Sequence, residues 1–395
     1  MTHADRAGAI GPDERLNMHV VDTTVFFSPT SGGVRRYLTA KHEWYATRGP
    51  CRHTLLVPGE VERFEPGGLT TLRGTRVPGT FNYRLPLDPQ RWSSLLEALE
   101  PDLIEVGDAF HPAWCAAQVA QRRGIPLVAF FHSNLPELVR RRMGGAIGGG
   151  FARYVRWLYR RFDAVLAPSR FMRDYLHSLG VTRVHCQPLG VDTDVFNPAQ
   201  RVLDVRRELG LPAKARVLVF AGRFSGEKNL PVLFDAFARL GDPYHLLLIG
   251  GGEAKQHARN VTAIPYRRDV GELARWIASA DALVHAGTRE TFGLVIIEAL
   301  ACGRPVIGTR AGAVPELVDE SVGQLAVPHD AASFADAIAS LYDRDTEALG
   351  RAARERALRY SWGHTFQAQL NTYVTLGARL ALPLATARPP HATSA

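Results

Sequence analysis

Two acidic residues, Glu290 and Glu298, are the side chains whose type and spacing best suit ligand chemistry. They lie in residues 285–308, where the pattern of apolar and polar residues predicts a strand, a loop, a helix, a turn and a second strand. Glu298 falls in the apolar run 294–301, where an unpaired carboxylate is costly to bury. We therefore expect both glutamates to bind a ligand. The alternative is a surface loop acid and a solvated helix acid.

The predicted start of this helix near Gly293 suits phosphate. The first N–H groups of a helix have no intrahelical partner and lie at the positive end of its dipole, so they can hold a diphosphate. Glycine at this position leaves room for the phosphate. Glu298 lies about 7.5 Å further along the axis, at roughly 1.5 Å per residue, within reach of the ribose, whereas Glu290 precedes the helix and would face the sugar. The N–H groups expected at the diphosphate are those of Gly293, Leu294 and Val295.

The same segment resembles the E-x7-E signature of the retaining glycosyltransferases of family four. The residues around the two glutamates match as well; they are Phe292, Gly293, Leu294, Ala299 and Cys302 to Val306. The resemblance extends over nearly the whole chain, from residue 18 to about residue 380. It implies the GT-B fold, an α/β architecture in which two Rossmann-like, doubly wound domains face a central cleft.

The resemblance also implies roles for two basic residues, Arg223 and Lys228. In the family, an arginine and a lysine at these places neutralise the donor diphosphate as it leaves. The chemistry agrees, because cleavage of a glycosyl–phosphate bond places negative charge on the phosphate, and without a metal the cations must come from side chains and helix dipoles. Two solvated surface cations are the alternative.

Further donor-site residues are implied in both halves of the chain. Gly32 and Gly33 resemble the family's glycine loop, which approaches the phosphates or the acceptor from the opposite side, although an ordinary tight turn also accounts for them. His132 stands where the family has a histidine beside the transferring sugar, and we expect it to hold a sugar hydroxyl or to position the acceptor; a lone histidine is usually only a packed residue. Tyr266 marks the segment expected to contact the base, and Phe292 completes the donor-binding set.

The activity implied is metal-independent transfer of a hexose, glucose or mannose, from a UDP- or GDP-sugar to a hydroxyl of a glycan or glycolipid. The acceptor would attack on the face that the phosphate leaves. No cofactor is expected, because the nucleotide sugar is a substrate. Asp192 and Asp194 form a D-x-D pattern, but they lie in a proline-bounded linker, so no metal site is expected. A nucleotide-sugar epimerase or hydrolase of the same fold and a non-catalytic sugar-nucleotide-binding subunit remain as alternatives.

The elements that must position these residues alternate between short apolar runs and helical patterns, as in parallel sheets wound with helices. Such sheets bind ligands at the carboxyl ends of their strands. The linker 188–198 divides the chain into a first domain, 18–195, completed by a helix at 362–382, and a second domain, 196–361. Strands are expected at 19–24, 53–57, 103–106, 127–131, 164–167, 184–187, 217–220, 245–249, 261–264, 282–285, 305–308 and 323–326, and helices at 34–48, 90–99, 112–123 and 170–179.

The overall composition fits this organisation. A length of 395 residues suits two domains, and 46% hydrophobic with 22% charged residues is ordinary for a folded chain. Residues 1–17 and 388–395 are predicted to be disordered. The sequence shows no signal peptide and no membrane-spanning run, and its four cysteines are scattered, which favours a cytoplasmic protein.

The net charge of +8 does not by itself identify a partner, and no nucleic acid is expected. Residues 140–162 are the most informative basic segment, because arginines there alternate with aromatic residues at helical spacing. Such a helix can rest on an anionic membrane, which would place the protein at the inner membrane face. Packing of the aromatic residues into the first domain is equally consistent. Within it, the glycine-rich stretch 143–150 follows no strand and is expected to be a mobile connector.

Overall fold

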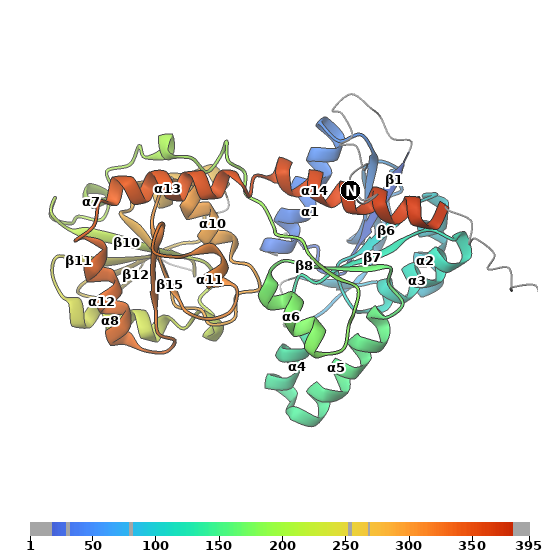
Figure 1. The fold of residues 1–395 in the computed structure, drawn as a ribbon, viewed down its shortest axis with the longest axis horizontal. Coiled ribbons are helices and arrows are strands. Elements are labelled where there is room, and N and C mark those ends of the chain that lie inside the picture. The colour runs from blue at the N-terminus through green and yellow to red at the C-terminus, as the bar shows by residue number, and fades with distance from the viewer. Residues whose placement is uncertain (1–17, 29–31, 79–81, 252–254, 268, 382–395) are drawn as a thin grey trace, which may run out of the picture.

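The computed structural model describes residues 18–28, 32–78, 82–251, 255–267 and 269–381. Two predominantly parallel β-sheets, each wrapped by helices, form two domains that lie side by side (Figure 1). The predicted α/β fold with two doubly wound domains is confirmed. The segments 1–17 and 388–395, for which disorder is predicted, lie outside the described residues.

The first sheet has the strand order β3-β2-β1-β6-β7-β8-β9, and every neighbouring pair is parallel. Its central strands are short and buried on both faces, as expected for a sheet covered by helices, although β1 and β6 also bury the acidic side chains of Asp22 and Glu105. The strands are β1 (His19–Thr23), β2 (Arg52–Gly59), β3 (Leu69–Arg73), β6 (Leu103–Val106), β7 (Leu127–Phe130), β8 (Ala164–Ala167) and β9 (Val184–Cys186), with a small ribbon of β4 (Thr75–Arg76) and β5 (Arg84–Leu85). The helices are α1 (Gly33–Thr47), α2 (Pro89–Ala98), α3 (His111–Arg123), α4 (Leu135–Met143), α5 (Gly145–Tyr159) and α6 (Arg170–Ser178).

The second sheet has the order β12-β13-β11-β10-β14-β15-β16, in which only the β12–β13 pair is antiparallel. Its strands are β10 (Arg216–Ala221), β11 (Tyr244–Ile249), β12 (Lys255–Ala258), β13 (Val261–Ile264), β14 (Ala282–His285), β15 (Val306–Thr309) and β16 (Gly323–Ala326). The helices are α7 (Val205–Glu208), α8 (Leu230–Leu240), α9 (Val270–Ser279), α10 (Leu294–Ala301), α11 (Val314–Leu317), α12 (Ala331–Leu341) and α13 (Thr346–Leu358), with short 3-10 turns η1 (Pro198–Gln200) and η2 (Gly226–Lys228).

Every strand and helix predicted from the sequence is present, with ends that differ by at most two residues. The strands that the sequence pattern missed lie at sheet edges. β3, with the sequence Leu-Thr-Thr-Leu-Arg, buries only alternate residues, so it lacks the continuous apolar run of the central strands. Parallel pairing with β2 nevertheless makes it part of the sheet.

The glycine-rich segment 143–150 is helical, and its prediction as a mobile connector is wrong. Gly144, with φ of 88°, separates α4 from α5, and α5 begins at Gly145. Glycine has a packing role at one position, Gly148, because a β-carbon there would lie 2.4 Å from the Cα of Arg140. Glycine is therefore needed for α4 and α5 to pack closely, and this packing outweighs its low helix propensity.

The last helix, α14 (Trp362–Ala381), returns to the N-terminal domain after the chain has completed the second domain (Figure 1). The two crossings between the domains are hydrogen bonded to each other: the Val191 N–H donates to the carbonyl of Tyr360, and the Trp362 N–H donates to the carbonyl of Val191. Gln187 also donates its side-chain amide to the carbonyl of Thr365. Both crossings therefore form one paired junction.

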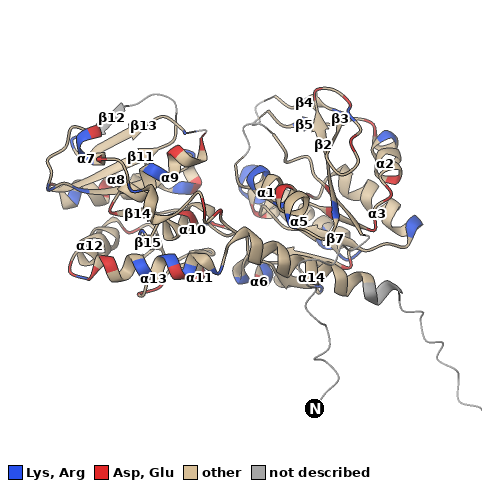
Figure 2. Ribbon diagram, turned by 90° about the horizontal axis from the view of Figure 1, so that it is seen from above, with Lys and Arg blue, Asp and Glu red and all other residues tan. Residues whose placement is uncertain are grey.

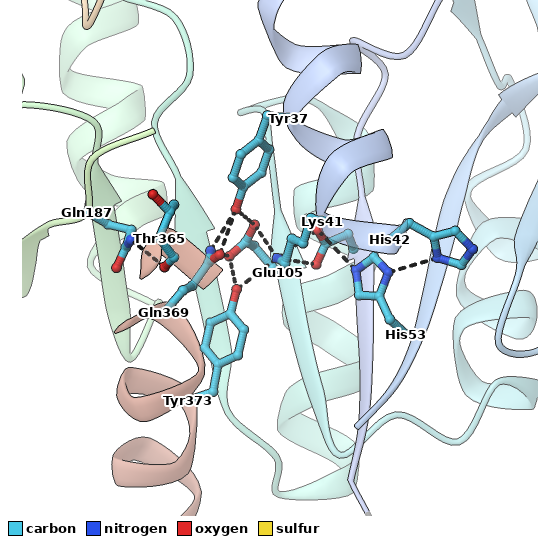
Figure 3. Close-up of polar contacts among 10 residues, drawn as sticks. Tyr37, Lys41, His42, His53, Glu105, Gln187, Thr365, Gln369 and Tyr373 are labelled. Carbon is cyan, nitrogen blue, oxygen red and sulfur yellow. Dashed lines mark hydrogen bonds and ion pairs between the residues drawn. The ribbon is translucent and has the colours of Figure 1, made fainter. Parts of the chain in front are cut away.

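A buried polar network attaches α14 to the N-terminal domain (Figure 3). Lys41 of α1 pairs with Asp22 on β1 at 2.8 Å and with Glu105 on β6 at 2.9 Å, and all three side chains are almost completely inaccessible. The remaining donors to the Glu105 carboxylate are Tyr37 from α1 and Gln369 and Tyr373 from α14. Because every acceptor position of Glu105 has a donor, the network can hold charges that are otherwise costly to bury.

Charged side chains lie mostly on helices and loops, around sheets that are largely apolar (Figure 2). Among the described residues, none of the helices combines the length and the hydropathy needed to cross a bilayer.

Candidate active site

Helix α10 begins where the phosphate-binding helix is predicted. Its N-cap, Gly293, has φ of 102°, a conformation that favours glycine, and no side chain caps the first turn. A β-carbon at Gly293 would lie 3.0 Å from Cδ1 of Ile296. Leu294 and Val295 are half-buried in the first turn, and the side chain of Phe292 is buried against Tyr360. Only the backbone of Phe292 is therefore in a position to contact a ligand.

Glu298 lies on α10 with its side chain only 4% exposed. Its carboxylate forms an ion pair with the guanidinium of Arg36, which belongs to α1 in the other domain. The burial agrees with the apolar run around Glu298, and the cation that accompanies it comes from a part of the chain that the sequence motif does not contain.

Glu290 precedes α10 and contacts two other residues of the second domain. It forms an ion pair with Lys228 at the end of η2, and His285 Nε2 lies 3.0 Å from its Oε1. Burial alone would raise the pKa of Glu290, but the charge of Lys228 and the contact with His285 outweigh it and hold this pKa well below its usual value. Glu290 is therefore a carboxylate held in one orientation by two donors.

Arg223 and Tyr266 lie in loops that follow strands β10 and β13, on the same edge of the sheet as α10. The Arg223 side chain is mostly exposed and lies 3.8 Å from Glu227. Tyr266 is half-exposed and close enough to Arg36 to interact with it electrostatically. The second domain thus brings the predicted cations and the predicted base-contacting segment to one edge.

The N-terminal domain contributes Gly32, Gly33 and His132. Gly32 is the N-cap of α1, and a β-carbon on Gly33 would lie 3.1 Å from Cδ1 of Leu294, so the start of α1 faces the start of α10. His132 follows β7, and its ring stacks on Phe130 with centroids 4.3 Å apart. Burial lowers the pKa of His132 to about 3, with a smaller contribution from Lys41, so its imidazole is neutral at ordinary pH.

Further contacts cross between the domains at the same edge. The Ser169 hydroxyl donates to the carbonyl of Thr291 at 2.7 Å. Glu316 accepts hydrogen bonds from the N–H groups of Arg170 and Phe171, at 2.9 and 2.7 Å, and so caps the first turn of α6 from the other domain. The two domains are therefore in contact along this edge.

Asp192 and Asp194 have a structural explanation. The Asp192 Oδ1 accepts hydrogen bonds from the N–H groups of Asp194 and Val195, at 2.9 and 3.0 Å, which forms a turn in the linker. Within the described ranges, no group of three or more acidic, histidine or cysteine side chains is arranged to hold a metal ion.

A wide hollow of about 980 Å³ lies at the ends of β2 and β3, beside the β4–β5 ribbon and the start of α2. The carboxyl ends of parallel strands lie at one edge of the sheet, so this hollow lies at the same edge as His132, which follows β7. Two of its arginines have carboxylate partners, since Arg84 contacts Glu60 and Arg91 contacts Glu62. Its other charged lining residues are Arg73, Arg76 and Asp88.

Two side chains of the site were missed by the sequence analysis, namely Arg36 and His285. His285 ends an apolar strand five residues before Glu290, so a buried polar residue at a strand end was a usable signal. Arg36 is in the first turn after Gly32 and Gly33, but nothing in the sequence indicates that this turn meets α10.

The similarities to known proteins agree with this geometry. A family model described as Glycosyltransferase Family 4 matches residues 31–195, and one described as Glycosyl transferases group 1 matches residues 215–344. The chain is 30% identical over 375 residues to a GDP-mannose-dependent alpha-(1-6)-phosphatidylinositol dimannoside mannosyltransferase of Mycobacterium tuberculosis, which covers 91% of this chain and 96% of that protein.

Solved structures share the fold. Sucrose-phosphate synthase from Thermosynechococcus elongatus matches with a TM-score of 0.75 and 22% identity, over 92% of this chain and 100% of its own. The Anabaena HepE protein in complex with UDP and glucose matches with a TM-score of 0.71 and 21% identity, over 91% and 100%. Fold and similarity together define the class: an enzyme, a glycosyltransferase with the GT-B fold. Within that class, the chain belongs to glycosyltransferase family four.

Proposed function

We propose that this enzyme is a retaining hexosyltransferase that moves mannose from GDP-mannose to a hydroxyl of a glycan or glycolipid without a metal. The observation that supports it most directly is the start of α10, an uncapped helix terminus with a positive-φ glycine between two glutamates that are each held by a cation. GDP-mannose is preferred because the similar mycobacterial protein is named for it. Glucose from UDP-glucose is the second candidate.

In this proposal the diphosphate lies at the first N–H groups of α10, between Arg223 and Lys228. The Glu298 carboxylate accepts hydrogen bonds from the two ribose hydroxyls, and the Glu290 carboxylate accepts hydrogen bonds from hydroxyls of the hexose. Each assignment follows the order of groups along a nucleotide sugar and the burial of the two carboxylates. Lys228 already contacts Glu290, so one ammonium group can orient the sugar-binding carboxylate and still lie beside the β-phosphate.

The chemical step breaks the bond between the anomeric carbon and the β-phosphate oxygen and forms a bond from that carbon to the acceptor oxygen on the same face. The acceptor proton passes to the departing phosphate. Arg223, Lys228 and the α10 dipole stabilise the negative charge that develops on the phosphate. His132, neutral because burial lowers its pKa to about 3, can exchange hydrogen bonds with a sugar hydroxyl but is unsuited to supply a full positive charge.

The acceptor would enter through the N-terminal domain, along the hollow at the ends of β2 and β3. Arg73 and Arg76, the two lining arginines that do not contact Glu60 or Glu62, suit an acceptor that bears a phosphate or carboxylate. The name of the similar mycobacterial protein, which specifies a phosphatidylinositol dimannoside, supports a lipid-linked acceptor.

Helices α4 and α5 form a basic hairpin that suits contact with an anionic membrane. Between Leu135 and Arg161 the only acidic residue is Glu137, and the apolar side chains of Leu138, Met143 and Ile147 are exposed near the junction of the two helices. Most of the apolar face of α5 is buried, so this contact rests on the hairpin end and its charges. The exposed arginines are Arg140, Arg141, Arg142, Arg153, Arg156, Arg160 and Arg161.

The central test is a panel of nucleotide sugars screened by thermal shift and by transfer or donor hydrolysis. A ligand at a hundred times its dissociation constant should add about 2.7 kcal/mol of stability. Stabilisation by GDP-mannose, with retention at the anomeric centre of the product, is expected. If no nucleotide sugar stabilises the protein, the proposal fails; activity that requires added Mn²⁺ or Mg²⁺ contradicts its metal-independent part.

Membrane contact is tested by co-sedimentation with vesicles of phosphatidylglycerol and phosphatidylcholine. Substitution of Arg141 and Arg142 by glutamine should weaken binding, at a cost of roughly 1 kcal/mol per arginine. The matched control replaces Arg351 and Arg359, two exposed arginines on the other domain, and should leave binding unchanged. Absence of binding at low salt, or equal losses in both double variants, excludes this surface.

A further inference from the structure

The ion pair between Arg36 and Glu298 joins the two domains at the site expected to hold the nucleotide. The Glu298 carboxylate is 4% exposed and the Arg36 side chain 29%, so the pair is largely shielded from water. Within the described part of the chain, Arg36 is the one side chain recorded in hydrogen-bond contact with this carboxylate. Removal of the guanidinium would leave a buried charge unsatisfied.

Arg36 lies close to residues that are expected to surround the bound nucleoside. Gly33, one turn earlier on α1, lies against Leu294 at the start of α10. Tyr266, in the segment expected to contact the base, interacts electrostatically with Arg36. The guanidinium thus contacts the carboxylate expected to bind the ribose, and it is within electrostatic range of the tyrosine expected to lie near the base.

A guanidinium and a ribose diol make the same kind of contact with a carboxylate. Each presents adjacent hydrogen-bond donors that can point at its oxygens together. With the guanidinium in contact, the Glu298 side chain is only 4% exposed, so a ribose diol can reach the carboxylate only after the guanidinium has moved aside. The ribose and Arg36 therefore compete for Glu298.

We propose that Arg36 occupies the place of the ribose hydroxyls in the donor-free enzyme and must leave Glu298 before the nucleotide can bind. This inference rests on the proposed function, in that Glu298 is taken to bind ribose. Since Arg36 belongs to one domain and Glu298 to the other, the same exchange breaks a bridge between the domains. Arg36 thereby makes the affinity for the donor weaker than it would be if the Glu298 carboxylate had no competing partner.

The proposal is tested with the Arg36→Met variant, which keeps most of the apolar stem. Titration calorimetry with GDP and with UDP should show a dissociation constant that falls about 5- to 10-fold in the variant, because the binding-competent fraction of the site increases. Stopped-flow measurement should show faster association. The melting temperature of the ligand-free variant should fall, and its rise on nucleotide addition should be larger than in the parent. Arg48→Met, at the exposed far end of α1, is the matched control and should change none of these quantities.

A mutant cycle with Glu298→Gln separates competition from direct contact between Arg36 and the nucleotide. In the Glu298→Gln background, Arg36→Met should have no further effect on affinity. Weaker or unchanged nucleotide binding by Arg36→Met in the otherwise native enzyme overturns the inference and leaves the proposed function intact, provided that the parent binds nucleotide. If neither parent nor variant binds GDP or UDP, both the inference and the proposed function fail.

Discussion

Substitution of Glu290 and of Glu298 should affect ligand affinity in different ways. Glu298→Gln should raise the dissociation constant of the free nucleoside diphosphate roughly 10- to 100-fold, because hydrogen bonds to a charged group are lost. Glu290→Gln should leave the affinity for free nucleotide nearly unchanged and reduce the additional affinity for the nucleotide sugar. Calorimetry with nucleotide and nucleotide sugar measures both effects. Equal losses for both ligands in both variants would contradict the separate roles.

At the scale of single residues, the sequence predicts the burial and role of the two glutamates better than it predicts the cations that contact them. Glu298 could be predicted to be buried because it interrupts an apolar helical run, and Gly293 could be placed at the helix start because of its type. The cation that contacts Glu298 could not be predicted, because Arg36 is 262 residues away and its position depends on how two domains meet. Local spacing contains no information on that contact.

The conformation of α10 gives a prediction at the scale of the element. Gly293→Ala places a β-carbon on a residue with φ of 102° and 3.0 Å from Ile296, so the variant should lose about 1–3 kcal/mol of stability from backbone strain. It should also weaken nucleotide binding, because the start of the helix must shift. Urea unfolding and calorimetry measure the two effects. Gly226→Ala, where a β-carbon meets nothing within 4 Å, is the control and should unfold like the parent.

The attachment of α14 depends on the buried network around Lys41. Lys41→Met should destabilise the protein by about 3–5 kcal/mol, because it leaves Asp22 and Glu105 buried without their cation. Lys214→Met, on an exposed lysine of the second domain, serves as the control in the same urea unfolding measurement. A change below about 1 kcal/mol would show that one of the two carboxylates is protonated and needs no cation.

The helical hairpin of α4 and α5 shows why some elements escape prediction. A run of glycines favours a loop when each residue is judged by its own propensity. In the helix, Gly148 allows Arg140 of α4 to approach closely, and a packing contact of this kind is visible only once both helices are placed. The arginine and aromatic spacing that follows was sufficient to predict the rest of α5.

For the whole molecule, buried histidines determine how stability depends on pH. Burial, followed by the charge of Arg52, lowers the pKa of His19 to about 4, and burial lowers that of His132 to about 3. Both are neutral when folded but take up protons on unfolding below about pH 6.5, so their contribution is complete above that pH and is lost as the pH falls toward the folded pKa. The melting temperature should be lower at pH 5 than at pH 7.5, on the order of 5 °C.

Scanning calorimetry of the parent and of His19→Gln checks this expectation. The glutamine can keep one contact, to Thr54 or to the carbonyl of Leu99, but it does not titrate. The difference in melting temperature between pH 7.5 and pH 5 should therefore be smaller in the variant. An unchanged difference would assign the pH dependence to other groups.

Two doubly wound domains were predictable because most central strands are short, largely apolar runs that a parallel sheet buries on both faces. The contacts between the domains were not, because they involve polar residues at loop and helix ends, such as Ser169 with Thr291 and Glu316 with the start of α6. Polar residues at the surface form such contacts only in one particular arrangement of the two domains, and the local sequence does not specify that arrangement.

The paired junction at Val191 and Ser361 has a consequence for engineering. Both termini of the described chain belong to the N-terminal domain, so the second domain is an insertion whose two ends meet at one bridged pair of residues. An insertion with adjacent ends can be exchanged for another by two cuts, without displacing the rest of the host fold. Replacement of residues 192–360 by the equivalent part of a relative would thus exchange the second domain while leaving the N-terminal domain continuous.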